Sequence, residues 1–413
     1  MIIIHHMNDK PLPRLLESSL RNAARTMPVV VVVGARQAGK STLVRELVAP
    51  NRVYLTLDDL DVRDQAESAP DDLVMRGDKM TLDEIQRAPD LMLAVKRAVD
   101  HRRQNGQFFL TGSANLLLMR RVSETLAGRA SYLTLWPMTR REQLGLGRAG
   151  IWDDLLRAEN DEWLDVVSSQ DISREDWTTL ARRGGYPTPA LHLDSSAARA
   201  TWFAGYTRTY LERDLQDISS MTALPDLRRL MRAASLRLGQ LVNQTELGRD
   251  VALPQPTVHR YLNILELSYQ IVRVPAYSVN RTKRLIKTPK LYWGDTGLAL
   301  HLAGGESASG MHLENLVLMD LLAWRETRNE PAEVLYWRTA SGEEVDFVVE
   351  TRGRVLPIEV KTTARPRQAD ARHLRSFLDE YGKRSYNALL LHTGDRVEWL
   401  APRILAAPWW RVI

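Results

Sequence analysis

The first third of the chain alternates between short apolar runs and amphipathic stretches. Residues 28–33 form a valine run that ends at a glycine, which is typical of a buried parallel strand. The same reasoning predicts strands at residues 53–57, 79–82 and 107–111, and helices at residues 40–48 and 91–100. Because buried strands alternate with helices, the pattern predicts a parallel α/β sheet over roughly residues 20–140.

The pattern changes after this sheet. Residues 150–218 lack β-branched runs and are interrupted by Gly184-Gly185-Tyr186-Pro187, so we expect a helical lid or linker there. Residues 219–284 are helical at first, and residues 285–413 return to mixed α/β, with strands expected at 345–349, 355–359 and 388–392. The chain is therefore divided into four parts: residues 1–149, 150–218, 219–284 and 285–413.

A phosphate-binding motif follows the valine run. It fits G-x-x-x-x-G-K-[ST] at every fixed position, and glycines there let the backbone fold closely around phosphate oxygens. Lys40 supplies a positive charge to the β- and γ-phosphates, and the Ser41 hydroxyl is suited to Mg²⁺. The sequence therefore predicts a site for ATP and Mg²⁺. The residues expected to bind the nucleotide are Gly34, Ala35, Arg36, Gln37, Ala38, Gly39, Lys40, Ser41 and Thr42.

An acidic pair follows the strand predicted at residues 79–82. Asp83 stands where a P-loop protein needs a carboxylate beside its metal, and Glu84 follows it directly. We expect Glu84 to polarise the attacking water, the step that separates a hydrolase from a nucleotide binder. The alternative is that Glu84 is a solvated carboxylate at the start of a helix.

Two further positions near the predicted sheet are candidates for catalysis. A hydroxyl at the end of the strand 107–111 would lie near the γ-phosphate as a sensor, and both Thr111 and Ser113 qualify. Arg129 follows on the same predicted side of the sheet, where it would reach the γ-phosphate of a neighbouring subunit as an arginine finger. The alternative for Arg129 is a surface arginine in a turn.

These motifs together resemble the bacterial and archaeal AAA-superfamily ATPases whose C-terminal half is a domain of unknown function. The resemblance spans nearly the whole chain, and Ala35 departs from it where the family often has proline. It implies ATP binding, a winged-helix segment at 219–284 and a nuclease-like fold at 285–413. Superfamily members present an arginine finger in trans, so we expect a homo-oligomer. The matching segments begin at Gly34, Leu82, Leu110, Leu126, Gly184, Tyr210, Thr288, Asp295 and Ile358.

A helix-turn-helix pattern lies in the third part of the chain. Leu247 is expected to pack in the first helix, and Val258, Leu262 and Leu265 in the second. The residues expected to face outward, toward DNA, are Thr257, His259 and Arg260. A basic run suited to phosphate contact follows, with Arg281, Lys283, Arg284, Lys287 and Lys290. Packing of this segment against its own ATPase core, or binding to a protein, is the alternative.

An acidic constellation in the last part resembles the PD-(D/E)xK nuclease core. Asp346 opens one strand, and Glu359 and Lys361 share a face of the next because strand side chains alternate. Glu314, on a helix predicted at 312–322, is the fourth acid. Carboxylate oxygens bind Mg²⁺, and a lysine beside them activates water. The usual proline before the aspartate is absent, and an inert core is the alternative to an active nuclease.

Composition narrows these predictions slightly. The absence of cysteine excludes disulfides, thiolate metal sites and cysteine catalysis. The net charge is +5 and the pI is near 9.4. This excess of positive charge is small for a chain of 413 residues, so it does not by itself indicate binding to nucleic acid. Without an apolar run of bilayer length or a signal peptide, we expect a cytoplasmic protein with no membrane contact.

The sequence leads to two functional hypotheses. In the first, the chain is an ATP-hydrolysing AAA-type protein that acts on, or is regulated by, DNA or other nucleic acid. In the second, it is an ATP-controlled regulatory scaffold that binds protein partners, and its C-terminal domain is catalytically inert.

Overall fold

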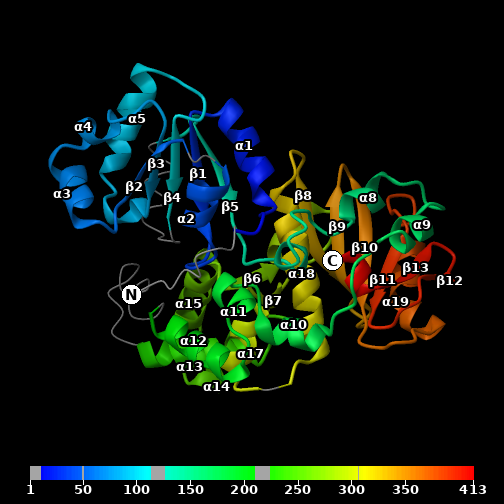
Figure 1. Ribbon diagram of the computed structural model, residues 1–413. Helices are drawn as coiled ribbons and strands as arrows, with labels where there is room; N and C mark the ends of the chain where they lie inside the picture. Colours follow the sequence, from blue (N-terminus) through cyan, green and yellow to red (C-terminus); the bar gives the residue numbers. More distant parts are fainter. Residues whose placement is uncertain (1–10, 49–50, 113–125, 210–223, 306) are drawn as a thin grey trace. The chain divides into compact units, whose positions relative to one another are not determined.

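The computed structural model describes all residues except 1–10, 49–50, 113–125, 210–223 and 306 (Figure 1). The chain divides into two compact units. The first contains Met1–Leu135 and Arg141–Arg148, and the second contains Trp136–Arg140 and Ala149–Ile413. The chain therefore leaves the first unit, returns to it for eight residues, and leaves it again. Among the described residues, no helix combines the length and apolar character that crossing a bilayer requires.

A five-stranded parallel sheet forms the first unit, which confirms the predicted α/β fold. Its strands lie in the order β2-β3-β4-β1-β5 (Figure 1). The carboxyl ends of all five strands consequently meet at one edge. The strands are β1 (Val29–Val33), β2 (Val53–Thr56), β3 (Met80–Asp83), β4 (Phe108–Thr111) and β5 (Ala130–Thr134).

Helices cover this sheet because their apolar stripes match its buried faces. Every valine of β1 is buried, and Leu16 and Leu20 of the first helix pack against Val30 and Val32. The predicted helices at 40–48 and 91–100 are both present. The helices of this unit are α1 (Leu16–Thr26), α2 (Lys40–Thr42), η1 (Leu43–Val48), α3 (Leu60–Ser68), α4 (Pro70–Val74), η2 (Ile85–Arg87), α5 (Leu91–His101) and most of α7 (Arg140–Gln143).

The second unit begins with short helices, as the pattern after residue 150 predicts. They are α8 (Trp152–Arg157), α9 (Trp163–Ser168), α10 (Trp177–Arg183), α11 (Pro187–Leu191) and α12 (Ser196–Thr209). A buried carboxylate joins two segments that carry the family resemblance. Asp295 accepts hydrogen bonds from the backbone N–H groups of Gly185 (2.6 Å) and Leu298 (2.7 Å). A Cβ at Gly184 would lie 2.6 Å from this carboxylate, so the glycine is required by the close approach.

Three helices and a two-stranded sheet follow. The helices are α13 (Leu224–Ser235), α14 (Gln244–Val251) and α15 (Gln255–Leu267). Strands β6 (Ile271–Val274) and β7 (Lys290–Trp293) pair antiparallel, and α16 (Arg281–Ile286) lies between them along the chain. Asn243 caps α14 by accepting from the backbone of Thr245 and Glu246, and Ala252 ends it in the left-handed conformation. The two helices predicted for this segment are confirmed.

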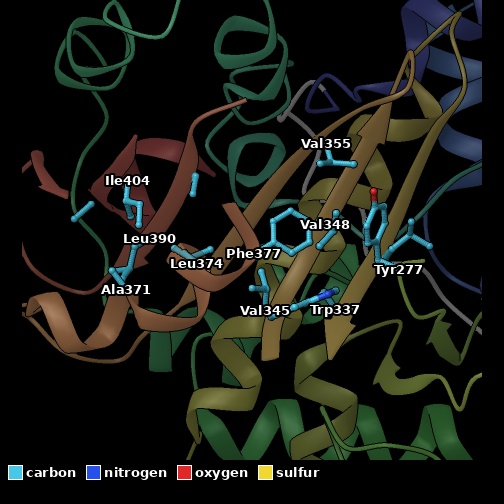
Figure 2. Close-up of a cluster of buried hydrophobic side chains, with 13 residues drawn as sticks. Tyr277, Trp337, Val345, Val348, Val355, Ala371, Leu374, Phe377, Leu390 and Ile404 are labelled. Atoms are coloured by element: carbon cyan, nitrogen blue, oxygen red, sulfur yellow. The ribbon is translucent and has the colours of Figure 1, made fainter. Parts of the chain in front are cut away.

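A six-stranded mixed sheet completes the second unit. Its order is β12-β13-β11-β10-β9-β8, and Figure 2 shows the side chains of Trp337 and Phe377 in its core. The strands are β8 (Ala332–Arg338), β9 (Glu344–Thr351), β10 (Arg354–Val360), β11 (Ala388–His392), β12 (Glu398–Ala401) and β13 (Ile404–Pro408). The accompanying helices are α17 (Thr296–Ala303), α18 (Gly310–Glu326), η4 (Gln368–Ala371), α19 (Arg372–Tyr381) and α20 (Trp409–Val412).

Candidate nucleotide site and acidic cluster

The phosphate loop leaves β1 at the carboxyl edge of the parallel sheet. Gly34 has φ +147°, and a Cβ there would lie 2.2 Å from the carbonyl oxygen of Leu135, so this position requires glycine. The loop is braced from outside by Arg14, whose Nη1 donates to the carbonyl of Ala38 at 2.8 Å. Glu142 accepts from Arg14 Nε at 2.9 Å, and both side chains are buried.

Lys40 is held inside this loop. Its ammonium donates to the carbonyls of Gly34 (3.1 Å) and Ala35 (2.9 Å), and the residue is buried. Ser41 and Thr42 follow in α2, where the first backbone N–H groups of the helical run favour an anion. Arg36 is half-buried and Gln37 is exposed, with Gln37 at φ +60°. The loop therefore places positive charge and helix-terminal donors where a phosphate chain needs them.

Asp83 ends β3 and accepts hydrogen bonds from three hydroxyl groups, which come from α2, β2 and the end of β4. Ser41 Oγ donates to Asp83 Oδ1 at 3.1 Å, and Thr111 Oγ1 donates to the same oxygen. The hydroxyl of Tyr54, on β2, donates to Asp83 Oδ2 at 2.6 Å. Burial and the neighbouring Asp83 carboxylate raise the pKa of Tyr54, so this tyrosine stays protonated as a donor. Both Asp83 oxygens are therefore oriented by neighbouring side chains.

Glu84 follows Asp83 in a strained conformation. Its φ of +57° is uncommon for a residue with a Cβ, and its backbone N–H donates to Thr111 Oγ1 at 3.3 Å. The side-chain amide of Gln86 donates to the Glu84 carboxylate. Strain of this kind is stored most often at functional sites, where the surrounding contacts enforce it. The left-handed backbone of Glu84 ends the extended path of β3 directly after Asp83.

The two sensor candidates separate in the structure. Thr111 is buried. Its hydroxyl donates to the Asp83 carboxylate and accepts from the backbone N–H of Glu84. Ser113 lies outside the described residues. Thr111 therefore orients the acidic pair, and a sensor role for either residue stays a prediction.

The predicted position of Arg129 is wrong. Ala130 pairs with Val29 at the start of β1, so Arg129 lies at the amino edge of the sheet, opposite the phosphate loop. The four steps from Val29 to Val33, at about 3.3 Å each, separate the two edges by about 13 Å. Arg129 Nε instead pairs with Asp100 at 2.6 Å. Action on a neighbouring subunit is not tested by this placement and stays a prediction.

The candidate nucleic-acid residues fall into two groups. On α15, His259 and Arg260 are exposed and Thr257 is half-buried, while Val258 packs inward as expected. Arg281 and Lys283 of α16 are also exposed. This exposed group is compatible with a contact to a large partner.

Two cations of the predicted basic run are not available for such a contact. Arg284 is buried, and its guanidinium pairs with Glu350 (2.5 Å) and Glu333 (2.6 Å). Lys290 is also buried, among carboxylates of the C-terminal sheet and of α18. The prediction that these two residues contact phosphates is therefore wrong, because internal ion pairs already neutralise their charges.

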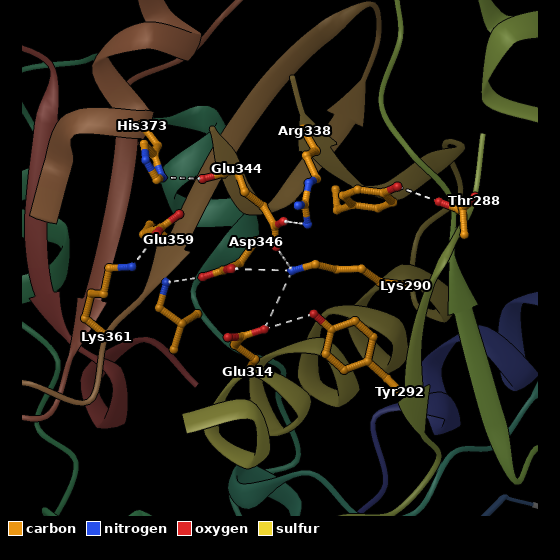
Figure 3. A network of polar contacts seen from close by, with 12 residues as sticks. Thr288, Lys290, Tyr292, Glu314, Arg338, Glu344, Asp346, Glu359, Lys361 and His373 are labelled. Carbon is orange, nitrogen blue, oxygen red and sulfur yellow. Dashed lines mark hydrogen bonds and ion pairs between the residues drawn. The ribbon is translucent and has the colours of Figure 1, made fainter. Parts of the chain in front are cut away.

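The structure brings the predicted acidic constellation together around Lys290 (Figure 3). Its ammonium lies 3.6 Å from Asp346 and 3.9 Å from Glu314, and it also contacts Glu344. Ile358 pairs with Phe347, so the next pair outward sets Asp346 opposite Glu359 on one face of the hairpin.

Several other polar atoms of this cluster are hydrogen-bonded, whereas the buried Glu359 Oε2 has no hydrogen-bond partner. Asp346 Oδ2 accepts from the backbone N–H of Val360 at 2.8 Å, and Glu314 Oε2 accepts from the hydroxyl of Tyr292 at 3.0 Å. Lys361 Nζ donates to Glu359 Oε1 at 2.6 Å (Figure 3). The cluster thus contains two ammonium groups beside its carboxyl groups.

Burial dominates the ionisation of these groups. Burial, together with the charge of Asp346, raises the pKa of Glu359 to about 8 and also raises the pKa of Glu314. Burial likewise raises the pKa of Asp346. Although burial alone would lower it, the carboxylates around Lys290 raise its pKa, so its ammonium stays charged. Near neutral pH the cluster therefore carries fewer negative charges than its residue count suggests.

Comparison with known proteins identifies the family. Residues 26–144 match the AAA domain, residues 174–309 match Domain of unknown function (DUF8612), and residues 309–412 match Domain of unknown function (DUF4143). The uncharacterized proteins Rv2008c of Mycobacterium tuberculosis and Mb2031c of Mycobacterium bovis are each 32% identical over 374 residues. The match covers 87% of this chain and 75% of each relative.

The chain belongs to their family, the AAA-domain proteins with a C-terminal DUF4143 domain. The AAA match covers the five-stranded sheet and its phosphate loop, so the first unit is a P-loop AAA-type domain. An uncharacterized protein of Haemophilus influenzae is 22% identical over 381 residues, covering 86% of this chain and 88% of the relative.

One solved structure shows a more distant similarity to this AAA-domain protein. The "walker-type atpase paby2304 of pyrococcus abyssi" is 17% identical, with 70% of this chain and 98% of that chain covered and a TM-score of 0.42. A similarity at this level bears on neither the partners nor the mechanism of the family member described above.

The acidic cluster of this DUF4143 domain does not fit a divalent metal. Mg²⁺ requires oxygen ligands at about 2.0–2.1 Å in near-octahedral geometry. Among the described residues, no group of three or more His, Cys, Asp or Glu side chains is arranged to hold a metal ion. The ammonium of Lys290 lies between the carboxylates that a nuclease would use, and Lys361 pairs with Glu359. We therefore derive no metal-dependent step for this domain.

Two residues of the AAA-domain protein were missed by sequence reasoning. Tyr54 was assigned only to a strand, although its hydroxyl bonds to Asp83. Lys290 was assigned to a basic run, although it belongs to the acidic cluster. A polar aromatic residue inside a predicted buried strand was the only signal for Tyr54, and nothing in the local pattern distinguished Lys290 from its neighbours.

Proposed function

We propose that this protein binds ATP together with Mg²⁺ and hydrolyses it. The contact of Ser41, in α2, with Asp83, at the end of β3, carries the proposal, because it sets a hydroxyl and a carboxylate together beside the phosphate loop. Glu84 follows Asp83 and is turned out of the strand by its backbone conformation. A nucleotide binder needs only the loop, whereas hydrolysis needs a base positioned next to it.

Each side chain has a distinct role in this proposal. Lys40 supplies positive charge to the β- and γ-phosphates, while Ser41 and Asp83 would hold the metal, directly or through water. Bound Mg²⁺ neutralises charge on the phosphate oxygens. Glu84 orients a water molecule and accepts its proton, and the Gln86 amide holds the Glu84 carboxylate until then. The Thr111 hydroxyl bonds to both Asp83 and Glu84 and fixes their positions relative to each other.

Two substitutions test the proposal on the full chain. Lys40→Ala should abolish ATP binding in calorimetry, because the phosphates lose their main charged partner. Glu84→Gln should bind ATP normally but hydrolyse it at least 100-fold more slowly, since general-base catalysis contributes roughly 10²–10⁴-fold. Glu67→Gln, an exposed carboxylate on α3, is the matched control and should change neither property. Normal turnover by Glu84→Gln would remove Glu84 from the mechanism.

We also infer that α13–α15 with β6 and β7 form a winged helix that contacts nucleic acid through α15. Three helices followed by an antiparallel pair support this assignment, as do the exposed side chains of His259 and Arg260. Replacing Arg260, Arg281 and Lys283 together by alanine should weaken DNA binding. It should also lower the log–log salt slope by about 0.9 for each phosphate of the duplex that the variant no longer neutralises.

A protein partner is the second candidate for this surface. Leu285 and Ile286 of α16 are 86% and 81% exposed, beside Arg281 and Lys283. Adjacent large apolar side chains that face solvent are more typical of a protein contact than of a phosphate contact. If the unsubstituted protein shows no DNA binding at low salt, the regulatory-scaffold hypothesis is favoured, with this segment as its contact surface.

A further inference from the structure

Lys290 occupies an unusual position for a lysine. It is the first residue of β7, and its side chain is only 3% exposed. Three carboxylates surround its ammonium, and they come from two different elements, with Glu314 on α18 and Glu344 and Asp346 on β9. Figure 3 shows the ammonium pointing into the space that these carboxylates share.

A protein cation in this position changes what the carboxylates can bind. Asp346 accepts from the Val360 backbone with its other oxygen, Glu314 accepts from Tyr292, and Glu359 from Lys361. A divalent ion would have to displace the Lys290 ammonium and leave it buried beside a second positive charge. Like charges in such surroundings repel strongly, because little solvent screens them.

We propose that Lys290 is the resident cation of this acidic cluster and takes the place that a divalent metal holds in an active nuclease. The C-terminal domain of this chain accordingly binds no metal at these carboxylates and does not cleave nucleic acid there. The cluster instead fastens the β6–β7 sheet to the six-stranded sheet. Arg284, which precedes β7, makes a second buried ion pair with the same sheet at Glu350.

Mn²⁺ binding to the full-length chain tests this proposal. Every protein in the series carries Asp83→Asn, which removes the carboxylate of the nucleotide site, and no nucleotide is added. Free Mn²⁺ is measured by electron paramagnetic resonance during titration. With Lys290 present, we expect no saturable Mn²⁺ site that depends on Asp346. Lys290→Met should create about one such site per chain, and adding Asp346→Asn should remove it again.

Each outcome of the series decides the matter. An Asp346-dependent Mn²⁺ site in the protein that retains Lys290 would overturn the proposal, whether or not Lys290→Met folds. Folded Lys290→Met protein that binds no Mn²⁺ would show that the lysine does not occupy a metal position. The Lys290→Arg variant keeps a positive charge at this position and should bind no Mn²⁺ there. Metal-dependent nicking of plasmid DNA by the otherwise unsubstituted chain, abolished by Glu359→Ala, would also contradict the proposal.

Discussion

Replacing Arg284 by methionine removes a buried positive charge but keeps most of the apolar stem. The guanidinium lies 2.5 Å from Glu350 and 2.6 Å from Glu333, and its Nε donates to the carbonyl of Ser278 at 2.7 Å. Glu350 is itself 4% exposed, so the substitution leaves a buried carboxylate with less compensation. The free energy of unfolding should therefore fall.

The size of this loss follows from the partners that remain. Breaking a buried pair on one side costs about 3–5 kcal/mol. Arg384 stays 3.4 Å from Glu350, and the Glu333 side chain is 46% exposed, so we expect the lower end of this range, about 3 kcal/mol. At roughly 2–4 °C per kcal/mol for a unit of this size, the Tm should fall by about 6–12 °C.

Tryptophan fluorescence during thermal unfolding measures this change selectively. All 11 tryptophans of the chain lie in the second unit, so the signal follows the unit that contains Arg284. Lys283→Met is the matched control: the neighbouring side chain is exposed, and its loss should alter stability by less than about 0.5 kcal/mol. Adding Glu350→Gln to Arg284→Met should recover part of the loss. Equal Tm values for the two methionine variants would refute the reasoning.

Two further predictions concern the Tyr54 hydroxyl, which donates to Asp83, and the ionisation of Glu359. Tyr54→Phe removes the 2.6 Å hydrogen bond to Asp83, so the Mg²⁺ concentration for half-maximal ATP hydrolysis should rise several-fold, with metal-free nucleotide binding unchanged. An unaltered Mg²⁺ dependence would show that Tyr54 does not orient Asp83. The pKa of Glu359 is raised to about 8, so its contribution to stability is complete below its unfolded pKa and is lost as pH rises through 8. Between pH 6 and 9 the Tm of the wild type should therefore fall relative to that of Glu359→Gln, and a constant difference would contradict the raised pKa.

Most of the parallel sheet could be predicted because its strands are continuous apolar runs. The strand that was missed is β5, whose sequence Ala-Ser-Tyr-Leu-Thr lacks the valine-rich signal of β1. That omission also caused the error at Arg129. Without β5, the arginine was placed after a strand end, whereas it precedes the start of the next strand.

The nucleotide site was predictable in part because the ends of parallel strands meet. A loop after β1 and an acid after β3 must lie at one edge, which placed Lys40 and Asp83 together. Tyr54 required the strand order, because only the pairing of β2 with β3 brings its hydroxyl to Asp83. Local patterns contain no information on which strands become neighbours.

Charge patterning failed for a different reason. A run of basic residues predicts an exposed surface only if no carboxylates fold over it, and the partners of Arg284 and Lys290 lie far away in the sequence. Glu350 and Asp346 reach them through the packing of β9, which neither composition nor periodicity specifies. The neighbouring Arg281 and Lys283 remain exposed, so cations from one short segment have opposite surroundings.

The return of the chain to the first unit at Arg141–Arg148 decides how this protein can be cut into fragments. Glu142 accepts from Arg14 Nε and from the backbone N–H of Leu15, and Arg14 in turn holds the carbonyl of Ala38 in the phosphate loop. A fragment that stops at Leu135 contains every strand of the parallel sheet but lacks the carboxylate that the Arg14 guanidinium contacts. An expression boundary after Arg148 keeps the brace, at the cost of including five residues that belong to the other unit.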